Sequence, residues 1–385
     1  MNAATTPAAT PMNTSELARR WRLILGRYAA AALPPGLSDA DAQLDQVLSY
    51  IYDREYTERG HRHQPGGGGS LDPSRLTALT WLERTRQLFP RSTFERLQAE
   101  AVERYGLTDL LADADTAAAL QPSPELGAAL LRVRGRLDAK LEAGLRLVIA
   151  RVVEEIVARI KTMFTSNLIG RRDRRRRSVQ PLAQNFDWRR TIQANLTHYD
   201  MENKRLLIDQ ARFNSRVRRR LPWEVILCVD QSGSMASSVL YSAVCASILA
   251  GLPGIDVRLI LFDTSVVDMT GLAHDPVGVL MTAQLGGGTD IAGALGFCET
   301  LVRTPARTVL VLISDFDEGG SVPSLLATVT RLREAGVTLL GLAALDEEAQ
   351  ADYDPHVGSL LADRGMQIAA LTPEHFATWL AEVIG

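Results

Sequence analysis

The sequence predicts an all-α region followed by an α/β domain, whose mainly parallel six-stranded sheet has helices on both faces. Two patterns predict this. Up to residue 170, apolar residues recur every three or four positions, which is the spacing of amphipathic helices. From Leu221 onward, short β-branched runs alternate with helical windows, and such alternation builds a parallel sheet. A chain of 385 residues also suggests two or three domains, at roughly 100–200 residues each.

The helical domain is expected to span residues 14–170, after a disordered start at residues 1–13 that is rich in Ala, Thr and Pro. Asp72-Pro73 and Ser123-Pro124 each place a capping oxygen before a proline at the first helical position. An apolar stripe that includes Val148 and Met163 predicts one long helix that faces a core. The predicted helices cover residues 15–31, 39–58, 73–89, 92–105 and 124–165.

The α/β domain is expected to span residues 221–385. In open parallel sheets, ligands bind at the carboxyl ends of the strands, near the point where the strand order reverses. The predicted strands cover residues 224–229, 257–262, 266–269, 308–314, 337–343 and 366–370, and the predicted helices cover 237–250, 276–283, 290–303, 321–334 and 373–383.

The composition indicates an ordinary globular protein, because 46% of the residues are hydrophobic and 23% are charged. Three cysteines, Cys228, Cys245 and Cys298, suit core strands and helices and are interpreted as buried thiols in a reducing compartment. The amino terminus lacks the pattern of a signal peptide, and no uninterrupted run of about 18 apolar residues occurs. We therefore expect a cytoplasmic protein that does not contact a membrane.

The net charge of -3 conceals a strong asymmetry along the chain. Residues 171–220 form a basic, arginine-rich connecting segment with 15 basic and 5 acidic side chains, a net charge of +10. Residues 221–385 carry 6 basic and 20 acidic side chains, a net charge of -14. These opposite charges favour docking of the basic segment on the acidic domain or on a partner. A solvated linker and a nucleic-acid-binding segment are the alternatives, and the latter would bind phosphates in a salt-dependent way.

Oxygen-bearing side chains follow two of the predicted strands. Asp230, Ser232 and Ser234 come directly after the first strand, and Asp315 closes the fourth. Thr289 follows three glycines in the loop before the helix that leads into the fourth strand. If the first and fourth strands are neighbours, all five oxygens converge. Carboxylate and hydroxyl oxygens suit Mg²⁺ (or Mn²⁺), and a sixth position would remain for an incoming carboxylate.

Other interpretations of these residues are weaker. Ser232 or Ser234 could cap the following helix, but capping does not account for Thr289 or Asp315. A nucleophilic serine lacks the Gly-x-Ser-x-Gly elbow, and no phosphate-binding Gly-x-x-x-x-Gly-Lys motif occurs. We therefore expect no catalysis. Three more acids close to strand ends could support the site from behind, although solvated loop positions are the favoured interpretation; they are Asp263, Asp317 and Glu318.

The pattern Asp-x-Ser-x-Ser, a glycine-rich loop with threonine and then Ile-Ser-Asp resembles the metal-ion-dependent adhesion site (MIDAS) of von Willebrand factor A (VWA) domains. The resemblance covers residues 221–385. It implies that Ser232 and Ser234 coordinate the ion directly, and Thr289 directly or through water. It implies that Asp230 and Asp315 act largely through water.

The segment from Pro181 to Ile192, with the arginines that follow it, is similar to bacterial CoxE-like VWA proteins. The helical region, with Trp81-Leu82 and Leu88-Phe89-Pro90, is similar to the YehP-like subset of that family. Such proteins are commonly paired with MoxR-type AAA+ ATPases. The resemblance therefore implies a non-catalytic adaptor or chaperone-like partner, which binds an acidic residue of the ATPase or of its client.

Overall fold

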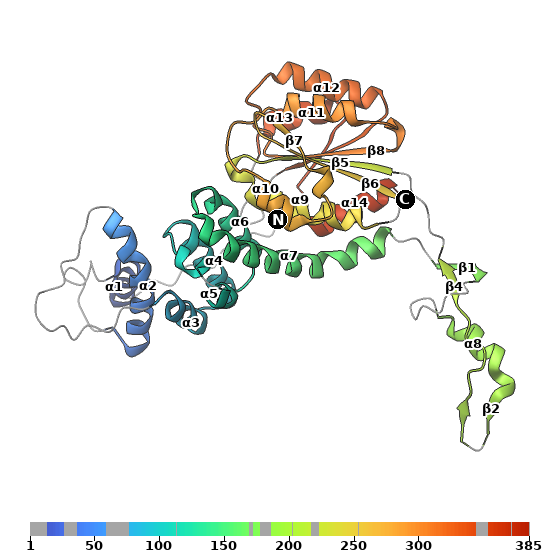
Figure 1. Cartoon of the computed structure of the whole chain (residues 1–385), viewed down its shortest axis with the longest axis horizontal. Coiled ribbons are helices and arrows are strands. Elements are labelled where there is room, and N and C mark those ends of the chain that lie inside the picture. Colours follow the sequence, from blue (N-terminus) through green and yellow to red (C-terminus); the bar gives the residue numbers. More distant parts are fainter. Residues whose placement is uncertain are drawn as a thin grey trace, which may run out of the picture. The chain divides into compact units, whose positions relative to one another are not determined.

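The structure is a computed structural model, and its contacts divide the chain into two compact units, residues 1–152 and 153–385 (Figure 1). The division falls inside one long helix. The residues that the structure describes are 14–26, 37–58, 77–112, 114–168, 172–177, 186–201, 203–216, 223–252, 254–343, 353–370 and 372–384. The expected disorder of residues 1–13 lies outside the described residues.

Helices make up the described part of the first unit, as the sequence predicts. They pack around Trp81, whose indole Nε1 donates to the backbone oxygen of Val47 at 3.0 Å. Gln98 is buried and satisfies both backbone groups of Gln121, at 2.8 and 2.9 Å. The elements are α1 (Thr14–Leu25), α2 (Asp39–Glu58), α3 (Ala78–Leu88), α4 (Arg91–Glu103), η2 (Thr108–Leu111), α5 (Ala114–Ala119), α6 (Pro124–Val133), η3 (Arg134–Arg136) and α7 (Ala139–Leu168).

Two helix predictions need correction. The helix predicted from residue 73 begins at Ala78, where the Thr77 side chain accepts a hydrogen bond from the backbone of Thr80 at 3.2 Å. The helix predicted over 124–165 is two helices, because the chain passes through η3 and becomes extended at Leu137. Gly135, a weak helix former, lies in this break. The apolar spacing continues across the break, so periodicity alone does not reveal it.

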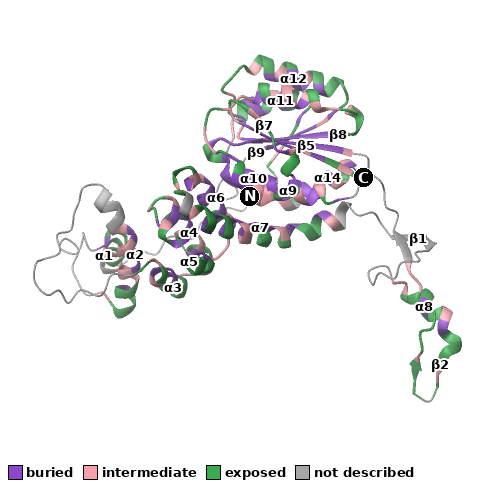
Figure 2. Cartoon of the chain, in the orientation of Figure 1, coloured by how far each residue is buried: buried purple, intermediate pink, exposed green. Residues whose placement is uncertain are grey.

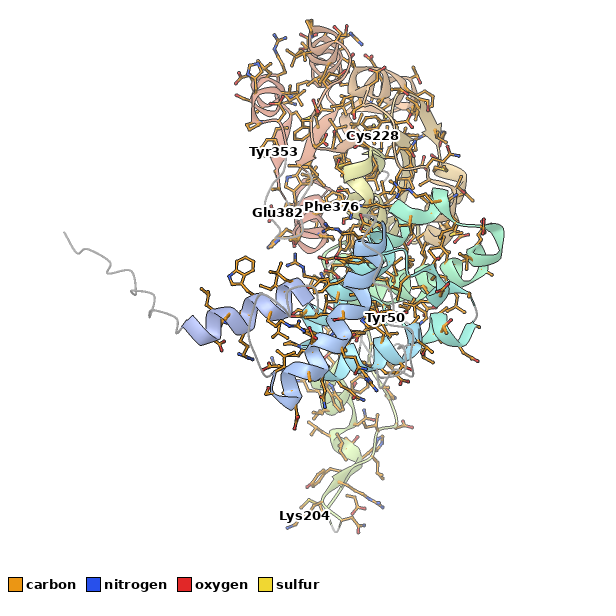
Figure 3. All side chains as sticks on the ribbon, turned by 90° about the vertical axis from the view of Figure 1, so that its left-hand side faces the viewer. Tyr50, Lys204, Cys228, Tyr353, Phe376 and Glu382 are labelled. Carbon is orange, nitrogen blue, oxygen red and sulfur yellow. The ribbon has the colours of Figure 1, made fainter. Side chains whose placement is uncertain are left out.

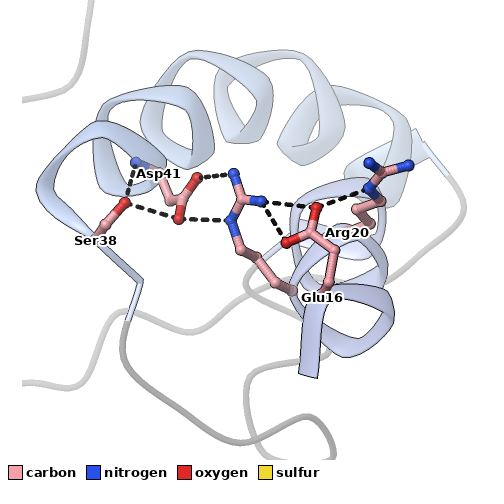
Figure 4. Close-up of polar contacts among 5 residues, drawn as sticks. Glu16, Arg20, Ser38 and Asp41 are labelled. Atoms are coloured by element: carbon pink, nitrogen blue, oxygen red, sulfur yellow. Dashed lines mark hydrogen bonds and ion pairs between the residues drawn. The ribbon is translucent and has the colours of Figure 1, made fainter. Parts of the chain in front are cut away.

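An ion-pair network joins α1 to α2 (Figure 4). The Arg19 guanidinium donates to both carboxylate oxygens of Asp41 at 2.8 Å, and it also bonds Glu16 on its own helix. Ser38 donates to Asp41 as well, at 2.8 Å. The Arg19 and Ser38 hydrogen bonds hold the pKa of the Asp41 carboxyl well below its usual range.

The apolar stripe of α7 is buried at Leu145, Val148, Val152, Ile156 and Ile160, which confirms the predicted core face. Its last predicted member, Met163, is exposed, and the next residue, Phe164, is buried instead. The Phe164 ring packs edge-on against Phe376 of α14 (Pro373–Ile384), with 6.1 Å between centroids. The carboxyl half of α7 thus packs on the α/β domain within the second unit.

The basic segment contains regular structure that the sequence analysis does not predict. Its outer strands, β1 (Arg172–Arg177) and β4 (Asn214–Arg216), pair antiparallel. Between them lies a small unit, here called the arm and defined as residues 186–213. It holds α8 (Trp188–Asn195), η5 (Leu196–His198), β2 (Tyr199–Asp200) and β3 (Arg205–Leu206). Figure 3 shows Lys204 at the β2–β3 turn that ends the arm.

A six-stranded sheet forms the centre of the α/β domain, in the order β10-β9-β8-β5-β6-β7. The β6–β7 pair is antiparallel and the other pairs are parallel. Each predicted strand is present, with bounds that differ from the prediction by at most two residues. The strands are β5 (Trp223–Asp230), β6 (Ile255–Phe262), β7 (Val266–Asp268), β8 (Thr308–Ser314), β9 (Thr338–Ala343) and β10 (Gln367–Ala369).

Helices cover both faces of this sheet: α11, α12 and α13 lie on one face, and α9, α10 and α14 on the other (Figure 1). The central strands are buried along almost their whole length, as Figure 2 shows. The short helix α13 (Pro355–Asp363) was not predicted, although Asp354-Pro355 is the same start signal that marks other helices here. The remaining elements are η6 (Gly233–Met235), α9 (Ala236–Ala250), η7 (Thr270–Leu272), α10 (Pro276–Thr282), α11 (Ile291–Leu301), η8 (Pro305–Arg307) and α12 (Val322–Glu334).

All three cysteines are buried free thiols, as predicted. Cys228 lies in β5 at the centre of the sheet (Figure 3). Burial and the neighbouring Cys298 thiol raise the pKa of the Cys228 thiol well above its usual range. The Cys228 thiol is therefore held in its neutral form within the core between β5 and α11.

Candidate functional site

Four of the five predicted site residues gather where β5 and β8 end: Asp230, Ser232, Ser234 and Asp315. The two strands are parallel neighbours at the centre of the sheet, with Val229 opposite Ile313. Asp230 therefore ends its strand one step beyond Val229, beside Ser314 at the end of β8. This confirms that the first and fourth predicted strands lie side by side.

Asp230 is fully buried and has a defined set of hydrogen-bond donors. One carboxylate oxygen accepts the backbone N–H of Ser232 at 2.8 Å, and the other accepts the hydroxyl of Ser314 at 2.9 Å. Burial raises the pKa of the Asp230 carboxyl above its usual range, and the nearby Asp315 charge adds to that rise. The two hydrogen bonds act in the opposite direction. A positive charge at this position would offset the cost of burying the carboxylate.

A chain of hydroxyl and carboxylate oxygens extends from Asp230 toward solvent. The Ser232 and Ser234 hydroxyl oxygens are 3.3 Å apart, and the Ser234 hydroxyl donates to Asp315 at 3.2 Å. Ser232 precedes η6, but its side chain makes no cap hydrogen bond to that helix, and neither does Met235 before α9. The capping interpretation of the two serines is therefore wrong. Their hydroxyls bond each other and the second carboxylate instead.

Asp315 is held in place by an unusual backbone conformation at the next residue. Phe316 has a φ of 59°, a left-handed conformation that is rare for a bulky side chain, and its ring is fully buried. The ring packs edge-on against Tyr353 at 5.7 Å, and the backbone of Asp315 accepts the N–H of Asp354 at 2.8 Å. Packing therefore balances the cost of the strained turn that presents Asp315.

Two glycines leave space for the Phe316 ring and for its neighbour Tyr353. A Cβ on Gly341 of β9 would lie 3.1 Å from Phe316 Cζ and 2.6 Å from Ile368. A Cβ on Gly358 of α13 would lie 2.9 Å from Tyr353. Sequence analysis missed Phe316 and both glycines, because none of them carries site chemistry. The carboxylate depends on them through packing.

The loop that contains Thr289 is tied to the same edge of the sheet by backbone hydrogen bonds. Gly286 donates to the backbone oxygen of Gln231 at 3.0 Å, and Gly319 donates to that of Thr289 at 2.9 Å. Gly286 and Gly287 have φ values of 130° and 94°, which favour glycine. Thr289 itself is half-buried. The prediction that the glycines allow a tight turn near Asp230 is thus consistent with the loop geometry.

Two acids described above as solvated loop residues have structural roles. Asp263 accepts hydrogen bonds from the Gln231 side chain at 3.1 Å and from the backbone of Ser265. Glu318 accepts the backbone N–H of Ile291 at 2.9 Å at the start of α11, and burial raises its pKa. The solvated interpretation is therefore wrong for these two residues. They hold the loops that surround Thr289 and the Asp230 motif.

Hydroxyls rather than carboxylates supply most of the candidate donor set. Within the described parts of the chain, no group of three or more His, Cys, Asp or Glu side chains is arranged to hold a metal ion. The predicted set contains two carboxylates and three hydroxyl side chains. Its donors therefore suit a hard cation that keeps water ligands, and they do not suit zinc.

Among the described residues, the segment Gly233–Ala250 has the length and the apolar composition of a membrane-spanning helix. Buried residues make up 61% of it, and it packs against β5 and β6 as η6 and α9. Core helices of globular domains pass the same test.

The fold and the oxygen-lined sheet edge define a VWA domain, and comparison with known proteins specifies the family. The family described as "VWA domain containing CoxE-like protein" matches residues 157–380. The chain is also 45% identical over 372 residues to the "Uncharacterized protein YehP" of Escherichia coli K12, which covers 96% of this chain and 97% of that protein. This chain belongs to the CoxE-like family of VWA proteins.

Solved structures match parts of the chain with low sequence identity. A von Willebrand factor type A structure from Catenulispora acidiphila is 16% identical, covers 45% of this chain and 43% of its own, and has a TM-score of 0.33. An aerotolerance-related membrane protein from Bacteroides fragilis is 14% identical, covers 42% of this chain and 98% of its own, and has a TM-score of 0.34.

Proposed function

We propose that the chain is a non-catalytic, metal-dependent protein-interaction protein. In this proposal Asp230, Ser232, Ser234, Thr289 and Asp315 hold Mg²⁺ (or Mn²⁺), and a carboxylate of a partner completes the coordination shell. The observation that carries it is the oxygen chain from buried Asp230 through the two serines to Asp315. When bound, the ion would offset the negative charges of Asp230, Asp315 and the partner's carboxylate.

The oxygen spacing supports this proposal. Adjacent ligands in an octahedron with metal–oxygen distances of 2.0–2.1 Å lie about 2.9 Å apart. The Ser232–Ser234 and Ser234–Asp315 oxygen pairs are separated by 3.3 and 3.2 Å. The two serine hydroxyls are therefore close enough to bind one ion, and Asp315 is close enough to reach the same ion through water, as the resemblance implies. The raised pKa of Asp230 also fits a site that binds a cation.

The partner side of the proposal follows from the family. We infer that a MoxR-type AAA+ ATPase, or its client, supplies the carboxylate, and that this chain acts as an adaptor or chaperone-like cofactor in the cytoplasm. VWA domains are interaction modules.

The experiment is a capture assay with the immobilised full chain and a purified MoxR-type AAA+ ATPase of the same organism. Binding is measured with Mg²⁺, with EDTA, and with Asp230→Asn or Ser234→Ala in place of the wild type. Asp363→Asn is the matched control, because that carboxylate is exposed on α13, outside the site. The proposal expects capture to need both the metal and the two site residues. Capture that survives EDTA and both substitutions, and is lost to nuclease or high salt, would support the nucleic-acid alternative instead.

A further inference from the structure

The arm (residues 186–213) is a folded unit with its own small interior. The side chains of Thr191 and Asn195 are fully buried within it. Asn195 donates to the backbone oxygen of Gln210 at 2.9 Å and accepts the backbone N–H of Asp209 at 2.8 Å. At the base of the arm, Phe186 pairs with Phe213 as an isolated bridge and their rings meet edge-on at 5.5 Å. Polar side chains thus close the interior of the arm.

Large apolar side chains lie on the outside of this unit instead. Trp188, Ile192 and Leu196 are four residues apart and therefore form one stripe along α8 and η5. Trp188 is 68% exposed and Met201, at the tip, is 80% exposed. Residues 188–208 contain seven exposed large apolar side chains, each at least 44% exposed: Trp188, Ile192, Leu196, Tyr199, Met201, Leu207 and Ile208.

The exposed apolar area is as large as one side of a stable interface. At roughly 200 Å² for each fully exposed large side chain, the seven exposed fractions give about 800 Å². A standard protein interface buries about 800 Å² on each partner. In the part of the chain that the structure describes, no other element covers these side chains. They are therefore available to another molecule.

The charge around the arm indicates which kind of molecule could bind its exposed apolar side chains. Arginine-rich sequence flanks the arm on both sides, with six arginines in residues 171–177 and four in 216–220. If two arms paired directly, the arginines that flank them would be brought together and would repel one another, so direct pairing of arms is disfavoured. The α/β domain has the opposite charge, and residues 259–302 contain five acidic residues and no Lys or Arg. A second copy of the chain therefore presents a surface of complementary charge.

This acidic stretch includes an exposed apolar spot at the outer strand of the sheet. β7 is the last strand in the described sheet order, so its outer side has no strand neighbour there. Val267 of β7 and Leu272 of η7 are both 37% exposed. The carboxylates of Asp268 and Asp275 lie beside them in the sequence and are exposed. We call the segment from residue 263 to 275 the β7 edge.

We propose that the arm of one copy docks on the β7 edge of a second copy. The apolar stripe of α8 packs on Val267 and Leu272, and the flanking arginines face the acidic residues of the partner copy. Reciprocal docking gives each pair two equivalent contacts and closes a twofold dimer, the commonest form of homo-oligomer. This inference is independent of the metal proposal, because it uses neither Asp230 nor Asp315.

The arm fits a protein surface better than a membrane or a nucleic acid. Met201, the most exposed apolar residue, sits at the tip between two acids, Asp200 and Glu202, which anionic lipids would repel. The arginine-rich strands β1 and β4 are at the opposite end of the arm. The arginines and the apolar tip would therefore not contact the same membrane surface at the same time. The stripe on α8 is mostly aliphatic, whereas bases stack on aromatic side chains.

The test is sedimentation equilibrium of the full chain, first at low salt. The wild type is expected to reach about twice the chain mass of 42.1 kDa. The double variant Ile192→Ser with Leu196→Ser, and separately Asp268→Lys, should each weaken self-association at least tenfold. Raised salt should also weaken it, because exposed charges are screened. Gln193→Ser on the same helix and Asp363→Lys on α13 are exposed controls and should self-associate like the wild type.

A mixing experiment separates docking of the arm on the β7 edge from general loss of structure. The arm variant keeps an intact β7 edge, and Asp268→Lys keeps an intact arm. An equimolar mixture therefore restores one of the two contacts, and it should dimerise more strongly than either variant alone. The proposal is overturned if the wild type is monomeric at all concentrations, or if the mixture behaves like the separate variants. Binding of a monomeric wild type to anionic vesicles or to single-stranded DNA, lost in the arm variant, would assign the arm to those ligands instead.

Discussion

Replacing Ser314 with alanine should destabilise the α/β domain more than a single buried hydroxyl normally would. The Ser314 hydroxyl is fully buried, donates to Asp230 at 2.9 Å, and accepts the backbone N–H of Phe316 at 3.0 Å. A hydrogen bond to a charged group contributes about 1.5–3 kcal/mol, and an unsatisfied buried N–H costs about 1–3 kcal/mol. We therefore expect Ser314→Ala to lower the free energy of unfolding by about 2.5–6 kcal/mol.

Urea denaturation of the full chain, followed by circular dichroism, measures this change as a shift of the transition in which the sheet unfolds. Ser324→Ala is the matched control, because Ser324 is exposed on α12; it should change the free energy by less than about 0.5 kcal/mol. A loss below about 1 kcal/mol in Ser314→Ala would refute the reasoning. It would mean that Asp230 and the Phe316 backbone find other partners, so that Ser314 does not hold the strand end in place.

Three further predictions concern the loops of the site and the first unit. Gly319→Ala places a Cβ 2.8 Å from the backbone oxygen of Thr289, so it should weaken Mn²⁺ binding at least tenfold in a titration. Gly296→Ala, with open space around its Cβ on α11, should leave binding unchanged and stabilise the fold by up to about 1 kcal/mol. Gly341→Ala should lower the free energy of unfolding by about 1–3 kcal/mol, because its Cβ meets Ile368 and Phe316; equal stability would show that the ring can move away. The pKa of Asp41 is depressed below its ordinary value of 3.8, so its contribution to stability is present above that value and is lost as the pH falls through the lower, folded pKa. In Arg19→Met, the free energy of unfolding should therefore fall less steeply as the pH is lowered below about 5. An unchanged pH dependence would contradict the claim that Arg19 depresses the pKa of Asp41.

The order of elements in the α/β domain could be predicted because each strand is a short apolar run with turn residues around it. The buried strands β5 and β8 have bounds within one residue of the prediction, since polar residues end both runs sharply. The break between α6 and α7 could not be predicted, because the apolar spacing continues through residues 134–138. The arm was missed because its interior consists of Thr191 and Asn195, which give no apolar period.

The residues of the candidate site could be predicted from the sequence, whereas the packing that holds them in place could not. Asp230, Ser232, Ser234 and Asp315 lie together as the strand order requires, and the structure gives their hydrogen bonds. Phe316 supports Asp315 through its left-handed backbone and through the packing of its ring. Gly341 of β9 and Gly358 of α13 leave space for that ring and for its neighbour Tyr353. That arrangement depends on contacts between residues far apart in the sequence, which no local pattern records.

The central claim is that one divalent cation binds on the Asp230 side of the sheet edge. Electron paramagnetic resonance of Mn²⁺ measures the free ion directly as the full chain is added. The account predicts one bound Mn²⁺ for each wild-type chain, displaced by excess Mg²⁺, and at least tenfold weaker binding in Asp230→Asn and in Ser234→Ala. Equal binding by the wild type and both variants, or no binding by the wild type at millimolar Mn²⁺, would contradict it.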